Sequence, residues 1–279
     1  MQVSIAVPSR NYARYLDSCL SSLRTQTHTD FEVLIADGGS TDHSLEIINR
    51  FCAEDSRFQL VSTEDSGQAD AIDKAFRVAR GEVFCYLNAD DLFLCCDALQ
   101  AVVDAFESYQ DIHLISAEGY YVDASGKYLK PVRLRYHPLD NVGWMKYRSA
   151  VLQPATFWRR HVYRDLPFDK DMHFVFDAQF FYRAYCHYSW LSIPKVVAGY
   201  RLHEENKSVT VRPIRILELA KFEQFKFGRL SPRASYLLVI YGLVRIATRI
   251  PVAGRYLTRA IYIIVNSLSF ATAYRLPSI

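Results

Sequence analysis

The first 117 residues alternate between short apolar runs and segments in which apolar residues recur at helical spacing. The apolar runs, rich in Val, Ile and Leu and closed by polar or turn residues, predict strands, and the segments between them predict helices. The predicted strands are 3–7, 32–36, 59–62, 82–87 and 112–117, and the predicted helices are 16–23, 44–52, 68–79 and 97–106. Such alternation is typical of right-handed crossovers and a parallel sheet covered on both faces. The pattern therefore predicts an α/β fold with a doubly wound, mostly parallel, Rossmann-like sheet.

Residues 118–210 follow a different pattern, with many aromatic residues and scattered Pro and Gly. A hairpin is predicted around 123–126, a helix near 177–187 and a strand at 192–200. We expect this part to pack on the first part rather than to fold alone. The sequence therefore predicts one domain in two halves, 1–117 and 118–210, followed by a helical tail at 211–279.

Polar residues close four predicted strands of the first half. They are Pro8-Ser9-Arg10-Asn11, the segment DGGSTD at 37–42, the segment TEDSGQ at 63–68, and Asn88-Ala89-Asp90-Asp91. In an open parallel sheet, ligands bind at the carboxyl ends of the strands, near the point where strand order reverses. Carboxylates gathered there repel one another unless a cation joins them, and hard oxygen ligands suit Mg²⁺ or Mn²⁺ bridging to phosphates. These segments therefore predict a site for a metal-bound diphosphate.

A turn followed by a helix N-cap is the alternative interpretation of DGGSTD, because Asp and Ser cap helices and Gly accepts positive φ. If that motif is considered alone, the turn is the favoured interpretation. For residues 88–91 ligand binding is favoured, because Asn88, Asp90 and Asp91 come directly after the apolar run 83–87. The metal is therefore expected at 88–91.

The order of these segments resembles that of the motifs of the family 2 glycosyltransferases. The resemblance is carried by VSIAVPSRN, LIADGGSTD, EDSGQADAIDKAF and GEVFCYLNADD, and it extends over about residues 3–210. It implies the GT-A fold and an inverting enzyme that takes a sugar from a nucleotide diphosphate sugar. It also implies a DxD-type motif that binds Mn²⁺ or Mg²⁺. Neither the sugar nor the nucleobase nor the linkage formed follows from it.

The resemblance implies donor-binding roles for residues in the first three motifs. Those that match contacts to the nucleobase and ribose are Pro8 and Asp37, with Ser9 beside Pro8. Those in the segment that closes over the nucleoside are Asp65, Gln68 and Asp70.

The fourth motif stands where the family has DxD. The resemblance makes Asp90 the main metal ligand, Asn88 a ribose or metal-shell contact in a donor-binding Asn88-Ala89-Asp90 segment, and Asp91 a hydrogen-bonding neighbour. Two positions depart from the family pattern. Asn88 replaces the first Asp of DxD, and Asp73 stands where many relatives have Asn.

The second half resembles the acceptor region of the same family, through VLQPATFWRR, MHFVFDAQFFYRA and YRLHEENKS in that order. Inversion requires a carboxylate opposite the leaving diphosphate, where it removes the proton of the acceptor hydroxyl. Asp177 fits this role by position, with a helix N-cap as the alternative. Its phenylalanine neighbours would raise its pKa by lowering the local dielectric. They are Phe174, Phe176, Phe180 and Phe181.

Five further residues complete the predicted site. Gln153, Trp158 and Arg159 are expected to border the acceptor pocket, with a core position as the alternative for the aromatic residue. His203 is expected to reach the metal or a donor phosphate, as a His does in many relatives, although a lone His after a strand is often only a loop residue. Arg201 is a second phosphate candidate, because a guanidinium pairs with phosphate oxygens in a bidentate manner.

Charge is divided unevenly along the chain. All 30 acidic residues and 25 of the 33 basic residues lie in 1–223, a net charge of −5, whereas 224–279 has eight basic residues and no acidic one. A basic segment of this kind indicates a polyanionic partner, either nucleic acid or an anionic membrane surface.

The apolar residues of the tail favour the membrane. Its longest uncharged stretches have 11 and 15 residues, at 234–244 and 260–274, whereas a spanning helix needs about 20. Arginines recur four positions apart among aliphatic residues, at Arg245 and Arg249 and again at Arg255 and Arg259. This pattern predicts helices that lie in the membrane interface within 229–279. It does not favour nucleic-acid binding, because proteins that bind nucleic acid rarely expose so much aliphatic surface. Packing on the body or a homo-oligomer interface is the alternative.

The remaining features concern location and rival functions. Six cysteines without CxxC spacing indicate reduced thiols, and the N-terminus lacks the pattern of a signal peptide. We therefore expect a cytoplasmic protein, peripheral at the inner face of the cell membrane, whose acceptor is a glycan or a polyprenyl-diphosphate-linked saccharide.

One rival to the transferase function is a non-catalytic, membrane-docked subunit with the same fold. The other, a sugar-phosphate nucleotidyltransferase, is less favoured because residues 8–11 lack the glycines of a phosphate loop.

Overall fold

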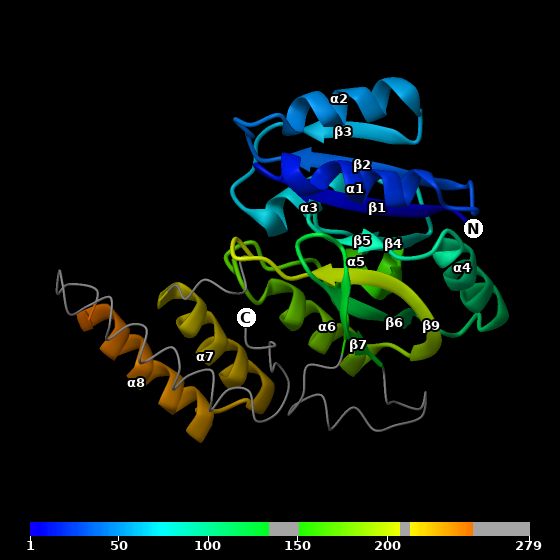
Figure 1. Cartoon of the computed structure of the whole chain (residues 1–279). Coiled ribbons are helices and arrows are strands. Elements are labelled where there is room, and N and C mark those ends of the chain that lie inside the picture. Colours follow the sequence, from blue (N-terminus) through cyan, green and yellow to red (C-terminus); the bar gives the residue numbers. More distant parts are fainter. Residues whose placement is uncertain (134–150, 207–212, 248–279) are drawn as a thin grey trace. The chain divides into compact units, whose positions relative to one another are not determined.

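The computed structural model describes residues 1–133, 151–206 and 213–247, and every structural statement below concerns these residues (Figure 1). The strands are β1 Val3–Ser9, β2 Phe31–Asp37, β3 Phe58–Ser62, β4 Val83–Tyr86, β5 Leu92–Phe93, β6 Leu114–Val122, β7 Tyr128–Val132, β8 Thr156–Arg159 and β9 Trp190–Arg201. The helices are α1 Ala13–Arg24, α2 Ser44–Glu54, α3 Gln68–Val78, α4 Ala98–Ser108, α5 Arg160–Asp165, α6 Phe176–His187, α7 Pro213–Phe227 and α8 Pro232–Ala247, and a short 3₁₀ turn spans Gln153–Ala155. Each strand and helix predicted for 1–210 is present within a few residues of its expected bounds.

The first half of the sheet is parallel. Its strands lie in the order β3-β2-β1-β4, with β1 between β2 and β4. Helices α1 and α2 cover one face and α3 covers the other (Figure 1). All residues of β1 and β2 are buried for this reason, which explains why these strands are almost continuous apolar runs.

The sheet continues beyond β4 with strands of mixed direction. Their order is β8-β6-β9-β5, and β7 pairs with β6 outside that order. Strand β8 is antiparallel to β4 and β6, β5 to β9, and β7 to β6, whereas β9 is parallel to β6. The sequence pattern does not reveal β5, β8 or α5, because elements of two, four and six residues are too short to show a period.

The chain forms two compact units. Among the described residues, the first contains 1–133, 151–171 and 183–203, and the second contains 172–182, 204–206 and 213–247. This division differs from the predicted one. The predicted boundary after residue 117 falls inside β6, which is one continuous strand. Residues 172–182, which include Asp177, belong with the tail helices rather than with the sheet.

In the second unit, α7 and α8 form a packed helical pair. Their shared core consists of Ile216, Ala220, Leu237, Ile240 and Val244. The spacing of these residues places them on one side of each helix, where they pack together. Among the described helices, none has both the length and the apolar character that a membrane-spanning segment requires. The predicted arginine pairs beyond Arg245 and the apolar stretch 260–274 lie outside the described residues.

Candidate functional site

The candidate site lies where the strand order reverses, between β1 and β4. Asn11, just after β1, has a φ of 59°, in the left-handed region that Asn adopts more readily than most residues. Its backbone N–H donates to Ser40 Oγ at 2.8 Å, and its side-chain Oδ1 accepts a bond from the Thr41 N–H at 2.8 Å. The turn after β1 is thus bonded to the loop after β2.

The loop after β2 folds around the carboxylate of Asp37. This side chain is fully buried, and its two oxygens accept bonds from the backbone N–H and the hydroxyl of Ser40 at 2.7 and 2.6 Å. Pro8 and Ser9 lie beside Ala36 and Asp37 in the β1–β2 pair. The Ser9 hydroxyl is buried and has no hydrogen-bond partner among the described residues. The turn named as the alternative for DGGSTD is present, and it holds Asp37 at the carboxyl edge of the sheet.

Gly38 allows the loop after β3 to approach the loop after β2. A Cβ atom at this position would lie 2.5 Å from Asp65 Oδ2, which is closer than van der Waals contact permits. Asp65 accepts a bond from the Gly67 N–H at 2.9 Å, and burial raises the pKa of its carboxyl group. The predicted donor residues Asp37 and Asp65 therefore lie on adjacent loops.

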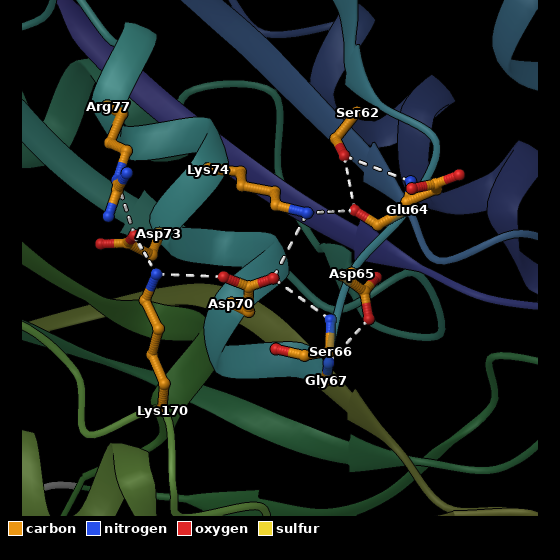
Figure 2. A network of polar contacts seen from close by, with 10 residues as sticks. All are labelled: Ser62, Glu64, Asp65, Ser66, Gly67, Asp70, Asp73, Lys74, Arg77 and Lys170. Atoms are coloured by element: carbon orange, nitrogen blue, oxygen red, sulfur yellow. Dashed lines mark hydrogen bonds and ion pairs between the residues drawn. The ribbon is translucent and has the colours of Figure 1, made fainter.

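Figure 2 shows that side chains of α3 hold the loop between β3 and α3. Asp70 Oδ2 accepts a bond from the Ser66 N–H at 3.1 Å and lies 3.3 Å from Lys74 Nζ. Lys74 also donates to the carbonyl oxygen of Glu64 at 2.5 Å. Both bonds attach the loop backbone to a helix, so the position of the loop depends on the position of α3.

Lys170 joins the two acidic residues of α3 (Figure 2). Its Nζ lies 3.0 Å from Asp70 Oδ1 and 2.6 Å from Asp73 Oδ2. Asp73 also accepts a bond from the Tyr163 hydroxyl at 3.0 Å and pairs with Arg77 at 2.8 Å. The bond from Lys170 is the main cause that lowers the pKa of Asp70 far below its ordinary value. The sequence around Lys170 does not predict its contact with α3. Its ammonium nevertheless provides the charge partner of the carboxylate at residue 73.

Asp90 and His203 meet beyond the end of β4. Asp90 Oδ2 lies 2.9 Å from His203 Nε2, both side chains are buried, and the imidazole packs on the ring of Tyr15 with 4.6 Å between centroids. The next residue, Asp91, accepts a bond from the Arg201 N–H at 2.8 Å. Burial, and then the charge of Asp90, raise the pKa of Asp91 well above its ordinary value. Arg201, the last residue of β9, thereby holds the turn at residues 88–91 that follows β4.

The guanidinium of Arg201 is bonded to protein acceptors. Its Nε donates to the carbonyl oxygen of Asp90 at 2.6 Å, and its terminal nitrogens donate to the Ala124 carbonyl and the Ser18 hydroxyl, each at 3.1 Å. The group also lies over the ring of Tyr15. These contacts show that Arg201 holds residues 90 and 91 in place, and the phosphate contact expected for it stays a prediction.

Asn88 connects predicted donor and acceptor residues. Its Oδ1 accepts a bond from Gln68 Nε2 at 2.7 Å, and its Nδ2 donates to Gln153 Oε1 at 3.1 Å and to Asp91 Oδ2 at 3.2 Å. Gln153 in turn donates to the Tyr86 carbonyl at 2.7 Å. The structure therefore brings Gln68 and Asn88, expected at the donor, together with Gln153, expected at the acceptor.

The residues at this turn fit a divalent cation. Asp90 and His203 offer a carboxylate oxygen and an imidazole nitrogen 2.9 Å apart, and the carboxylate is a ligand that suits Mn²⁺ or Mg²⁺. Within the described ranges, no group of three or more His, Cys, Asp or Glu side chains is arranged as a complete metal site. Ions of this class often take few protein ligands and complete their coordination with substrate phosphates and water. Ala89 has its methyl group in the core, so only its backbone is available to a ligand.

Residues 4–184 match the family model described as glycosyl transferase family 2, and this match covers more than half of the chain. The chain belongs to glycosyl transferase family 2. The family and the transferase class that the motifs implied are thus confirmed.

Related family members cover only part of the sequence. An uncharacterized glycosyltransferase of Nostoc sp. is 35% identical over 159 residues, which are 57% of this chain and 48% of that protein. Chondroitin synthase of Escherichia coli is 34% identical over 124 residues, which are 44% of this chain and 18% of that protein. This chain therefore spans about half of the first relative and a smaller share of the second.

Solved structures confirm the GT-A fold. S. aureus TarS 1–349 in complex with UDP-GlcNAc matches with a TM-score of 0.66 at 18% identity, over 85% of this chain and 69% of that one. The mannosyltransferase PcManGT from Pyrobaculum calidifontis, in complex with GDP-Man and Mn²⁺, matches with a TM-score of 0.60 at 19% identity, over 99% and 76% of the two chains.

Two residues expected beside the acceptor, Trp158 and Arg159, lie in β8 of this family 2 glycosyltransferase. Trp158 is fully buried in β8 and belongs to the core. Arg159 pairs with Val83 at the beginning of β4, and its Nε donates to the Ile112 carbonyl at 2.8 Å. The core position named as the alternative for Trp158 is observed, whereas acceptor contacts of the two residues stay a prediction. Because β8 runs antiparallel to β4, Arg159 lies at the beginning of β4, away from its carboxyl end. Gln153 precedes β8 and therefore lies at the site.

Asp177 belongs to the second unit, whereas the predicted donor residues all belong to the first. It lies within the first turn of α6, where its Oδ1 accepts a bond from the Ala178 N–H at 2.7 Å. Asp177 is half-buried, and the neighbouring Phe176 and Phe180 are buried. The base role of Asp177 and the effect of its phenylalanine neighbours on its pKa stay predictions.

Proposed function

We propose that the protein is an inverting, metal-assisted glycosyltransferase that moves a sugar from a nucleotide diphosphate sugar to a glycan or a polyprenyl-diphosphate-linked saccharide. The observation that carries the proposal is the convergence of Asp90 and His203, 2.9 Å apart, at the strand ends where the loops after β1 and β2 also lie. A metal-bound diphosphate requires such ligands at the carboxyl edge of a parallel sheet.

Mn²⁺ or Mg²⁺ is the proposed cofactor, with Asp90 and His203 as its protein ligands. When bound, the cation neutralises charge that develops on the departing diphosphate. Asn88 and Arg201 hold the turn that carries Asp90, through the bonds to Asp91 and to the Asp90 carbonyl. The Mn²⁺ in the PcManGT complex supports the choice of metal.

The nucleotide of the donor is proposed to bind along the ends of β1 and β2. Pro8, Ser9 and Asp37 would contact the nucleoside, and the β3–α3 loop with Asp65 would cover it. The buried Ser9 hydroxyl supports this role, because a ligand oxygen or nitrogen would complete its hydrogen bonding. UDP-GlcNAc in the TarS complex and GDP-Man in the PcManGT complex make UDP- and GDP-sugars the first donors to test.

Asp177 is the proposed general base. It would remove the proton of the acceptor hydroxyl as that oxygen attacks the anomeric carbon and the bond from this carbon to the diphosphate breaks, which inverts the configuration. Asp177 is half-buried, and Phe176 and Phe180 on the same helix are buried. An apolar environment raises the affinity of a carboxylate for a proton.

We also propose that the helical tail docks on the inner face of the cell membrane. Helix α8 packs on α7 through one side and exposes apolar residues on the other, with exposed fractions of 63% for Val239 and 49% for Leu243. No acidic residue follows Glu223 in the chain, so anionic lipid attracts this segment. All six cysteines are free thiols, in keeping with a reducing compartment.

Replacing Val239 and Leu243 together with Glu is expected to lower binding to vesicles of phosphatidylglycerol and phosphatidylcholine by about 10-fold or more. Each aliphatic side chain contributes about 1.5–3 kcal/mol when buried, and anionic lipid repels the new carboxylates. Co-flotation of the full-length protein measures the bound fraction. The matched control replaces Val78 and Tyr109, which are exposed apolar residues of the first unit, and should bind like the parent protein. Equal flotation of both variants contradicts the membrane proposal.

Lys170→Met is expected to raise the donor KM about 3- to 10-fold and to change kcat little. The loss of the ammonium leaves Asp70 and Asp73 without the cation that joins them, and an interaction of this kind contributes on the order of 1 kcal/mol. The loop bonded to Asp70 then loses part of its support. Steady-state kinetics with varied donor measures the effect, and Lys195→Met, which removes an ion pair with Asp97 at 2.6 Å, is the control. Unchanged donor KM in Lys170→Met means that Lys170 does not support the donor loop.

A panel of UDP- and GDP-sugars with Mn²⁺ tests the reaction itself. We expect one donor to bind and to be hydrolysed slowly by water, and to react faster with a lipid-linked saccharide. Failure of every donor to bind or react favours the non-catalytic subunit. Formation of a nucleotide sugar from a nucleoside triphosphate and a sugar phosphate favours the nucleotidyltransferase. Mass spectrometry of the products distinguishes the three outcomes.

A further inference from the structure

A carboxylate of α7 is bonded to the backbone directly before α6. Glu218 Oε1 accepts a bond from the His173 N–H at 2.9 Å, and Oε2 accepts one from the Phe174 N–H at 2.7 Å. Glu218 is only 2% exposed. A buried carboxylate is costly unless it accepts strong hydrogen bonds, and these two successive N–H groups supply them.

The same two segments meet again further along α6. The Tyr182 hydroxyl donates to the Lys226 carbonyl at 3.3 Å, and its ring lies edge-on to Phe222 with 6.1 Å between centroids. Residues 172–182 therefore contact α7 at both ends, within one compact unit. Asp177 lies between these contacts, three residues after Phe174.

We infer that Glu218 is a positioning residue for Asp177, so that α7 is part of the catalytic apparatus as well as of the tail. The inference rests on the proposed function, in which Asp177 is the base. The two bonds fix the backbone at residues 173 and 174, and α6 begins at Phe176, so they set where the first turn of the helix starts. A general base must lie within hydrogen-bonding reach of its proton, and a displacement of about 1 Å costs on the order of 10²-fold in rate.

Glu218→Gln in the full-length protein tests the inference. Glutamine has nearly the same size, but its amide nitrogen cannot accept a bond, so one of the two backbone N–H groups loses its partner. We expect kcat to fall about 10-fold or more, while the donor KM and the binding of donor with Mn²⁺ change by less than about 2-fold. The reaction measured is transfer from the donor found in the nucleotide-sugar panel, or its hydrolysis by water.

Glu223→Gln is the matched control. Glu223 is also buried on α7, where it pairs with Lys226 at 2.6 Å and with Arg233 at 3.6 Å, both of which lie in the tail helices. It should reproduce any general loss of helix stability, measured by thermal unfolding, without the loss of kcat. If Glu218→Gln does not fold, Glu218→Asp, which keeps the charge and is shorter by one methylene, takes its place with the same expectation.

Amide hydrogen exchange gives a readout that does not depend on activity. The His173 and Phe174 amides should exchange faster in Glu218→Gln and not in Glu223→Gln. The double variant Asp177→Asn with Glu218→Gln should be no slower than Asp177→Asn alone, because residues that act as a unit are non-additive.

The outcomes separate this inference from the proposed function. If Glu218→Gln is folded and keeps its kcat while Asp177→Asn is inactive, the positioning role is wrong and the proposed base stands. If Asp177→Asn keeps normal turnover, the proposed base itself is wrong.

Discussion

Asp90→Asn is expected to abolish metal-dependent donor binding and to lower kcat/KM by about 10³-fold or more. Asparagine preserves the size of the side chain but removes the charge that would hold the cation beside His203. Charge stabilisation by a bound metal contributes several kcal/mol to such a reaction, and each 1.4 kcal/mol is about tenfold in rate. Calorimetric titration of donor with and without Mn²⁺, together with initial rates, measures both effects.

Asp104→Asn is the control for Asp90→Asn. Asp104 is an exposed carboxylate on α4 in the same unit, so its loss makes the same change in net charge away from the site. It should leave donor binding and rate unchanged. An Asp90→Asn protein that still binds donor more tightly with Mn²⁺ than without it would show that the metal, if used, is held elsewhere.

Asp177→Asn is expected to lower the transfer rate by about 10²- to 10⁴-fold, which is the usual contribution of a general base. Donor binding should stay within about 2-fold of the parent value, because the amide removes only the ability to accept a proton and the residue is assigned to the acceptor side. Initial rates and calorimetric titration of the donor test the two parts of this prediction.

Asp171→Asn serves as the control for Asp177→Asn. It is an exposed aspartate six residues earlier in the chain, and it should behave like the parent protein. Normal turnover by Asp177→Asn removes this residue from the base role. Loss of donor binding in that variant would instead indicate that Asp177 belongs to the donor site.

The parallel half of the sheet was predictable because its strands are buried on both faces. The apolar runs 3–7 and 32–36 became β1 and β2, and the helices that follow them have the spacing expected for one buried side. Strand β8 was not predictable, because four residues show no period and its partners β4 and β6 lie far away in the chain. Short antiparallel strands are determined by the neighbours that they meet, not by their own pattern.

For the site, local motifs identified the residues but not their contacts. The positions of Asp37, Asn88 and Asp90 followed from their place at strand ends. The bond from Lys170 to Asp73 could not be deduced, since the two residues meet only when α3 packs against the loop between α5 and α6. The same holds for Glu218, whose carboxylate meets backbone N–H groups about 45 residues earlier in the chain; side-chain types give no sign of such a partner.

By itself the sequence determined the fold class, the glycosyltransferase family and the strand ends at which a donor site forms, because periodicity and ordered motifs are properties of neighbouring residues. Only the tertiary structure decided which of those residues meet. It brought Asp90 to His203, carried Arg159 to the far end of β4 and Trp158 into the core, and joined residues 172–182 to the tail helices. These outcomes depend on strand direction and on packing between distant segments, which no local pattern contains.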